Sequence, residues 1–70
     1  MAVDLLTRDP DILGGEAVFK GTRVPAKTLT DYLAAGETID NFLDDFPTVS
    51  RRQVLDFLDK ARMRLTTEAA

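Results

Sequence analysis

The sequence predicts a mainly α-helical protein, a three-helix, helix-turn-helix-like domain that follows a short N-terminal β segment or hairpin. Proline and glycine residues punctuate the first 24 residues and exclude a long helix there. Beyond Pro25, apolar residues recur at helical spacing in three stretches. We therefore expect a single domain over 1–70, with a strand and turn segment at 1–24 and helices at 25–35, 38–46 and 50–66.

The size and composition of the chain limit what can stabilise it. Seventy residues with 44% hydrophobic side chains can form one modest core. The absence of cysteine excludes a disulfide framework, and the absence of histidine removes the commonest general base. A chain this short often gains stability from a second chain, so we expect a homodimer or a hetero-oligomer.

The N-terminal segment contains two short apolar runs that suit strands, at 3–6 and 17–19. They can pair as a small hairpin around Gly14 and Gly15, or lend an edge to another chain. Isolated two-stranded hairpins are only marginally stable in water. The segment is therefore expected to dock on the rest of the domain or on a partner.

Two helices are expected in the middle of the chain. The first opens at Pro25, whose fixed φ suits a first turn, and ends before Gly36, a favoured left-handed cap. The second follows Thr38 as its N-cap and stops at Pro47. The predicted apolar faces comprise Leu29, Tyr32 and Leu33 in the first helix, and Ile39, Phe42, Leu43 and Phe46 in the second.

The third helix has the strongest start signal. Ser50 and Gln53 fit a capping box, in which the serine hydroxyl reaches the Gln53 amide and the glutamine side chain reaches back. Val49 and Val54 fit the hydrophobic staple that often accompanies such a box. The predicted apolar arc of this helix comprises Val54, Leu55, Phe57, Leu58, Ala61 and Leu65.

The net charge of −3 hides a gradient along the chain. Residues 36–49 carry four acids and no base, whereas residues 50–70 carry five bases and three acids. A polyanion should therefore meet the C-terminal third first. The sequence shows no signal peptide and no apolar run long enough to span a membrane, which predicts a cytoplasmic protein.

Catalysis is not expected. The glycines do not follow a phosphate-loop or dinucleotide spacing. The acids of the glycine-rich segment, Asp9, Asp11 and Glu16, are better explained by turn chemistry beside Pro10 than by a metal site. The sequence therefore predicts a binding protein that is not an enzyme and uses no metal or cofactor.

The second and third helices have the outline of a helix-turn-helix. In that motif the first residues of the second helix meet DNA, and arginine and glutamine can pair with guanine and adenine. The alternative is that any three-helix mini-domain contains such a turn. The predicted DNA-binding residues are Ser50, Arg51, Arg52, Gln53 and Asp56.

Two pairs of charges oppose the helix dipoles in this motif. Arg51 and Arg52 lie in the first turn of one helix, and Asp44 and Asp45 lie in the last turn of the other. Each reversal costs about 0.3–1 kcal/mol. Either the arginines are there to meet an external anion, or the acids and bases bridge each other across the turn.

The glycine-rich segment carries a family resemblance. The pair Gly14 and Gly15, the run KGTRVP at 20–25, LAAGETID at 33–40 and DFP at 45–47 occur in order. Together they closely resemble the domain-of-unknown-function family four hundred and thirty-three, over about 9–61. The resemblance implies a helix-turn-helix-like, VapB-like antitoxin. Such a protein would silence a toxin resembling the PIN ribonucleases and repress its own operon by binding operator DNA, as a dimer or as the complex.

By that analogy, some residues should contact the toxin. Arg23 can reach acids of a metal-dependent nuclease, and Glu37, Asp40 and Asp44 can cover a basic substrate channel. An equally good role for Arg23 is structural, tying the glycine-rich segment to the helices. The rival to the whole hypothesis is a protein-interaction module that never touches DNA, which the acidic net charge favours.

Overall fold

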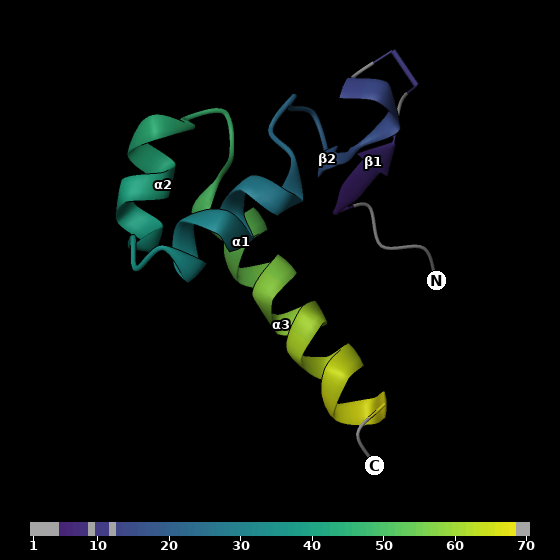
Figure 1. Ribbon diagram of the computed structural model, residues 1–70, viewed down its shortest axis with the longest axis vertical. Coiled ribbons are helices and arrows are strands. Elements are labelled where there is room, and N and C mark those ends of the chain that lie inside the picture. Colours follow the sequence, from purple (N-terminus) through teal and green to yellow (C-terminus); the bar gives the residue numbers. More distant parts are fainter. Residues whose placement is uncertain (1–4, 9, 12, 69–70) are drawn as a thin grey trace.

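The computed structural model describes residues 5–8, 10–11 and 13–68, and it contains a two-stranded hairpin followed by three α-helices (Figure 1). This arrangement confirms the predicted mainly α fold with an N-terminal hairpin. The elements are β1 (Leu6–Arg8), a 3-10 turn (Leu13–Gly15), β2 (Ala17–Phe19), α1 (Ala26–Ala34), α2 (Ile39–Asp45) and α3 (Arg51–Glu68).

The hairpin is antiparallel, with Leu6 opposite Phe19 and Arg8 opposite Ala17. The first strand therefore begins at Leu6, later than the expected run at 3–6, whose first two residues lie outside the described residues. The turn does form around Gly14 and Gly15, which have φ angles of 68° and 91°. Glycine adopts such left-handed angles without the steric cost that a Cβ brings.

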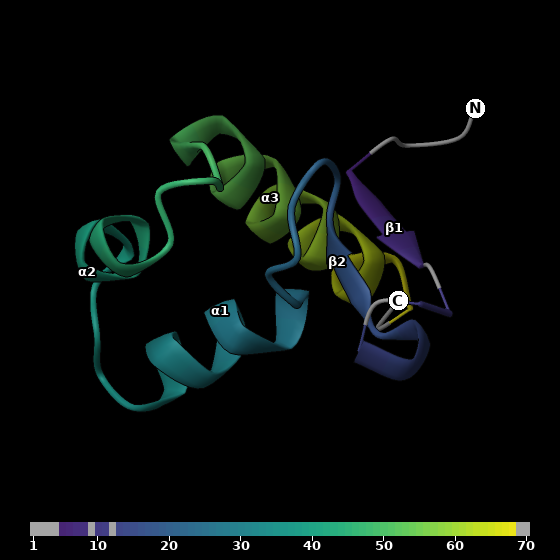
Figure 2. The ribbon, with the colours of Figure 1, turned by 90° about the horizontal axis from the view of Figure 1, so that it is seen from above.

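The run KGTRVP forms a second tight turn, which places the backbone after β2 back beside it. Gly21 has a φ of 79°, and the Thr22 amide donates to the Phe19 carbonyl at 2.9 Å. The Thr22 hydroxyl donates to the same carbonyl at 2.8 Å and accepts from the Val24 amide at 3.0 Å. The Phe19 amide then donates to the Val24 carbonyl at 3.0 Å. β2 is thus bonded on both sides, and β1 lies at the outer edge (Figure 2).

α1 begins and ends as its sequence predicts. Pro25 is its N-cap, with a φ of −65°. At the other end, Gly36 adopts a φ of 87° and donates to the Leu33 carbonyl at 3.1 Å, while the Glu37 amide donates to the Tyr32 carbonyl at 2.9 Å. These two bonds form a Schellman motif and satisfy carbonyls that the helix end would leave unpaired.

Both predicted caps of the helix-turn-helix are present. The Thr38 hydroxyl accepts from the Asn41 amide at 3.0 Å. The Ser50 hydroxyl accepts from the Gln53 amide at 3.1 Å, and the Gln53 side-chain oxygen accepts from the Ser50 amide at 2.9 Å. α3 starts where the capping box places it and continues to Glu68, two residues beyond the expected end.

The core lies where the three helices meet β2. Phe42 packs at its centre, with ring centroids 5.5 Å from Tyr32 and 5.1 Å from Phe46. Phe19 of the hairpin approaches Phe57 of α3 at 5.7 Å, which shows that the hairpin docks on the helices. The buried cluster comprises Phe19, Val24, Ala26, Leu29, Phe42, Val49 and Val54.

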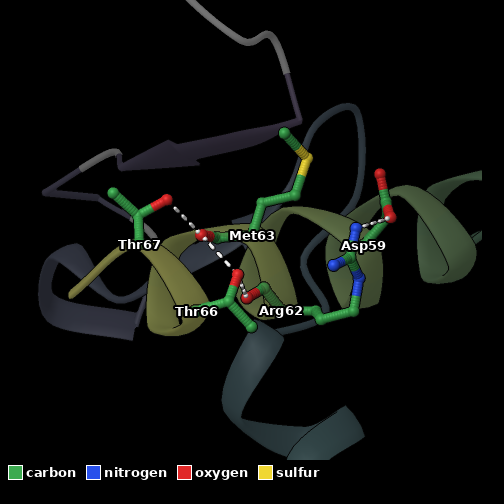
Figure 3. A network of polar contacts seen from close by, with 5 residues as sticks. All are labelled: Asp59, Arg62, Met63, Thr66 and Thr67. Carbon is green, nitrogen blue, oxygen red and sulfur yellow. Dashed lines mark hydrogen bonds and ion pairs between the residues drawn. The ribbon is translucent and has the colours of Figure 1, made fainter. Parts of the chain in front are cut away.

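The predicted apolar arc of α3 is only partly buried. Val54 is buried, but Leu55 is 47% exposed and Leu65 is 67% exposed. The buried face of α3 is therefore narrower and shorter than the predicted apolar arc. The second half of α3 runs away from α1 and α2, and there is less protein beside it (Figure 1). Its polar side chains bond within the helix itself: the Thr66 hydroxyl donates to the Arg62 carbonyl and the Thr67 hydroxyl to the Met63 carbonyl, at 2.9 and 2.8 Å (Figure 3).

Candidate functional site

The exposed end of the helix-turn-helix is the start of α3. The turn that leads into it is fixed by a bond from the Val49 amide to the Phe46 carbonyl at 3.1 Å. Burial of Val49 and Val54 on either side of the cap anchors the first turn of α3. The side chains of Arg51 and Arg52 are 56% and 85% exposed, so both are accessible to a ligand.

Each of these arginines has a carboxylate partner within the chain. Arg51 pairs with Asp40 at the start of α2, and Arg52 Nε lies 3.4 Å from the Asp56 carboxylate one turn along α3. Neither arginine pairs with Asp44 or Asp45, the bridging alternative that the sequence left open. Asp45 instead accepts a hydrogen bond from the Tyr32 hydroxyl at 2.6 Å, which holds the end of α2 against α1.

Ser50 and Gln53, the two uncharged residues among those predicted to bind DNA, make hydrogen bonds within the fold. The Gln53 side-chain oxygen closes the capping box, and its nitrogen donates to the Lys20 carbonyl at 3.0 Å. The glutamine amide therefore joins the start of α3 to the KGTRVP turn, 33 residues earlier in the chain. Sequence reasoning missed this tie, since nothing local in the sequence marks a bond between such distant residues.

Arg23 does not make the tie that its structural role required. Its side chain forms no hydrogen bond or ion pair with the described residues, and Gln53 makes the connection instead. Arg23 lies on the rim of an open hollow of about 750 Å³, to which Arg8, Phe46 and Thr48 also contribute. A cation there can reach a partner that enters the hollow.

The acids predicted to bind a partner lie at and near α2. Glu37 precedes the helix and accepts from the Asn41 side chain at 2.9 Å, Asp40 pairs with Arg51, and Asp44 is exposed. One of the predicted partner-binding acids and one of the predicted DNA-binding arginines are thus joined in a single ion pair.

Among the described residues, Tyr32 is the one whose side-chain pKa is clearly shifted. Its hydrogen bond to the Asp45 carboxylate is the main cause that raises the phenol pKa above the ordinary value of 10.0. Desolvation and the negative charges of Asp45 and Glu37 raise the pKa further, because all of them disfavour the phenolate.

A second hollow, missed by sequence reasoning, lies between the hairpin and the later turns of α3. We call it the α3–β1 groove. It has a volume of about 640 Å³, and its apolar lining comes from Leu5, Leu6, Phe57, Ala61 and Leu65. Lys60 and Arg64 also line it. The spacing of 57, 60, 61, 64 and 65 places one continuous stripe of α3 along the groove.

No helix among the described residues is long and apolar enough to cross a membrane. No three metal-ligating side chains gather within 5–8, 10–11 and 13–68 in a way that could hold a metal ion.

The three helices, the α2–α3 turn and the docked hairpin define a helix-turn-helix-like domain. The family described as "Protein of unknown function (DUF433)" matches residues 6–59, and the chain belongs to this family. A relative is the uncharacterized protein y4eO of Sinorhizobium fredii, 36% identical over 53 residues. The match covers 76% of this chain but 24% of y4eO, so it spans about a quarter of that relative. No solved structure matches the chain.

Proposed function

We propose that the protein is the antitoxin of a type II toxin–antitoxin pair, which binds and silences a PIN-like ribonuclease toxin and represses its own operon through the helix-turn-helix. The observation that carries the proposal is the pair of exposed arginines at the start of α3. Both partners, a ribonuclease and operator DNA, act in the cytoplasm, so the proposal includes a cytoplasmic protein that works as a homodimer or within the toxin complex.

The ion pairs of Arg51 and Arg52 do not prevent DNA binding. All four side chains are more than half exposed, and exposed pairs contribute only about 0–1 kcal/mol. A DNA phosphate can replace Asp40 or Asp56 at little cost, because an arginine–phosphate bond is charge-assisted and can be bidentate. The intramolecular pairs therefore hold the arginines in place until DNA arrives.

The roles of the predicted DNA-binding residues divide accordingly. Arg51 and Arg52 contact the DNA, while Ser50 and Gln53 fix the helix start through the capping box. Asp56 orients Arg52 rather than touching DNA, since a carboxylate is repelled by phosphate. Pairing of Gln53 with adenine would compete with the bonds that its side chain makes to Ser50 and Lys20.

The test is binding of the upstream intergenic DNA, measured by fluorescence anisotropy at several salt concentrations. Replacing Arg51 and Arg52 together by alanine should weaken binding and reduce the salt slope by about 0.9 per lost phosphate contact. The matched control is Lys27→Ala with Arg62→Ala, which removes the same charge from exposed positions outside the turn. Equal affinities for the two double variants would exclude the start of α3 as the DNA-binding element.

Toxin neutralisation needs its own test, which is inhibition of the PIN-like ribonuclease that the proposal expects a neighbouring gene to encode. Arg23→Ala should weaken inhibition if its unpaired cation enters the toxin. The triple change Glu37→Gln, Asp40→Asn and Asp44→Asn should weaken it if the acids cover a basic channel. If both variants inhibit as well as the wild type, these residues do not form the neutralising surface.

A second candidate function is a protein-interaction module without DNA binding. The observation that favours it is the pair of bonds by which the Gln53 side chain is held to Ser50 and Lys20 inside the fold, because reading a base would compete with both bonds. No affinity for the intergenic DNA, with or without the partner, would favour this candidate.

A further inference from the structure

The α3–β1 groove exposes apolar surface that the described residues do not cover. Leu65 stands 67% exposed at its mouth, although the same stripe of α3 is buried at Val54 and half-buried at Phe57. Burying apolar surface gains about 25 cal/mol per Å², so a segment that covers this stripe would gain binding free energy from it. The stripe thus continues the core-facing side of α3 past Phe57, to Leu65, where the described residues no longer bury it.

The charged side chains that line the groove are both basic. Lys60 and Arg64 are neighbours one turn apart on α3, and both line the groove. Lys60 forms no ion pair with any described residue. Arg64 Nε lies 2.9 Å from the Glu68 carboxylate, but both side chains are mostly exposed, so an incoming carboxylate can compete for the arginine.

We propose that the α3–β1 groove is the docking site for an amphipathic segment of a partner protein, with aspartate or glutamate side chains flanking its apolar face. The apolar face covers Phe57, Ala61 and Leu65, and the flanking acids meet Lys60 and Arg64. Ala61, the small residue between the two large ones, provides the depth into which an apolar side chain of the partner fits.

Charge is the reason to assign the groove to a different protein and not to a second copy. Two copies that joined through this stripe would bring Lys60 and Arg64 of one chain close to the same bases of the other. Like charges in close contact oppose association. The apolar side chains of α2 pack against the core, so α2 of a second copy offers little apolar surface to the groove. α2 also lies far from the last turns of α3 (Figure 1).

This inference deepens the proposed function, because it names a surface and a chemistry for the partner, and it rests on that function in requiring a protein partner. Its test is separate from that of DNA binding. DNA binding depends on Arg51 and Arg52 at the start of α3, whereas the groove lies toward the other end, so either property can fail while the other holds.

The experiment selects peptides of about 16 residues from a random displayed library on the full chain, and then measures the affinity of each selected peptide for a Leu65→Glu variant. Leu65→Glu places a carboxylate at the groove, where it repels the acids of the proposed partner. Because Leu65 is exposed, the substitution should leave the fold intact. The selected peptides should be acidic, with apolar residues at helical spacing, and should bind the variant at least about tenfold more weakly. Leu55→Glu is the matched control, exposed but outside the groove, and should bind them as the wild type does.

Reversing both bases, with Lys60→Glu and Arg64→Glu, should change the selected peptides from acidic to basic. Circular dichroism and urea unfolding of each variant establish that it is folded. The proposal is overturned if the selected peptides are basic or show no charge preference, or if none depends on Leu65. It is also overturned if sedimentation shows a dimer that Leu65→Glu dissociates, because the occupant would then be a second copy.

Discussion

The two halves of α3 differ in how the rest of the fold holds them. The first half is capped by Ser50 and Gln53, buries Val54 and contacts the hairpin through Phe57. The second half has no buried residue among those described, and its polar side chains bond to each other and to its own carbonyls (Figure 3). The first half of α3 therefore contributes most to the stability of the fold, and the second half leaves its surface exposed.

This difference explains how a chain of seventy residues can both fold and leave apolar surface for a partner. Small domains have little stability to lose, since the total is of order 0.05–0.15 kcal/mol per residue. The cap, the staple and the aromatic cluster concentrate that stability around Phe42. Substitutions in the two halves should therefore have very different effects on unfolding.

The largest effect is expected for Phe42→Ala. Phe42 is fully buried and contacts Tyr32, Phe19 and Phe46 by its ring, so the substitution should cost about 3–5 kcal/mol of unfolding free energy. Urea denaturation followed by circular dichroism measures the loss. If the alanine variant does not fold at all, Phe42→Leu, which keeps most of the apolar volume, should remain folded with a smaller loss. A loss below about 1 kcal/mol for the alanine variant would show that the core is not centred here.

Gln53→Ala should have the next largest effect, about 1–2 kcal/mol, because it removes both the side-chain acceptor that completes the capping box and the bond to Lys20. Gln53→Glu separates the two roles, since glutamate keeps the oxygen that caps Ser50 but lacks the amide that donates to the Lys20 carbonyl. The glutamate variant should lie between wild type and alanine in urea midpoint. If glutamate and wild type are equal, the bond to Lys20 does not contribute.

The contact between α1 and α2 should weaken at alkaline pH. The phenol of Tyr32 has a pKa above 10.0 in the folded protein, mainly because it donates to the Asp45 carboxylate. A raised folded-state pKa gives stability that is fully present below the unfolded pKa and is lost as the pH rises through the folded pKa. Between about pH 8 and pH 11, wild type should lose more stability than Tyr32→Phe. Parallel pH profiles of the two proteins would show that this hydrogen bond is not formed in solution.

The smallest effect on stability is expected for Leu65→Ala in the second half of α3. Leu65 is mostly exposed, so the change in unfolding free energy should stay within about 0.5 kcal/mol. Its effect on binding of an acidic peptide should be much larger. A loss of stability comparable with that of Phe42→Ala would mean that the two halves of α3 do not differ.

The sequence predicted the parts of this fold that depend on local chemistry. Pro25, Gly36, Thr38 and Ser50 each act through the backbone of their own turn, so their roles follow from type and spacing. The apolar faces of α1 and α2 were predicted for the same reason, because helical periodicity decides which side chains share a face.

The features that the sequence did not predict depend on how the helices and strands lie relative to one another. Periodicity places Leu65 on the apolar arc of α3 but does not show where the cover for that arc ends, and Leu65 is exposed. The partner of Arg51 could not be identified, because α2 presents Asp40 and not Asp44 to it. The tie from Gln53 to Lys20 and the α3–β1 groove both join residues far apart in the chain, and only the fold brings them together.

Amide hydrogen exchange along α3, measured by nuclear magnetic resonance on the dilute protein, tests the division of this helix most directly. The amides of Val54 and Leu58 should exchange only through global unfolding, whereas those of residues 64–68 should exchange at least about a hundredfold faster through local opening. Addition of an acidic groove-binding peptide should slow the second group. Equal protection along the whole helix in the free protein would contradict the account, because it would mean that the second half is already held by the fold.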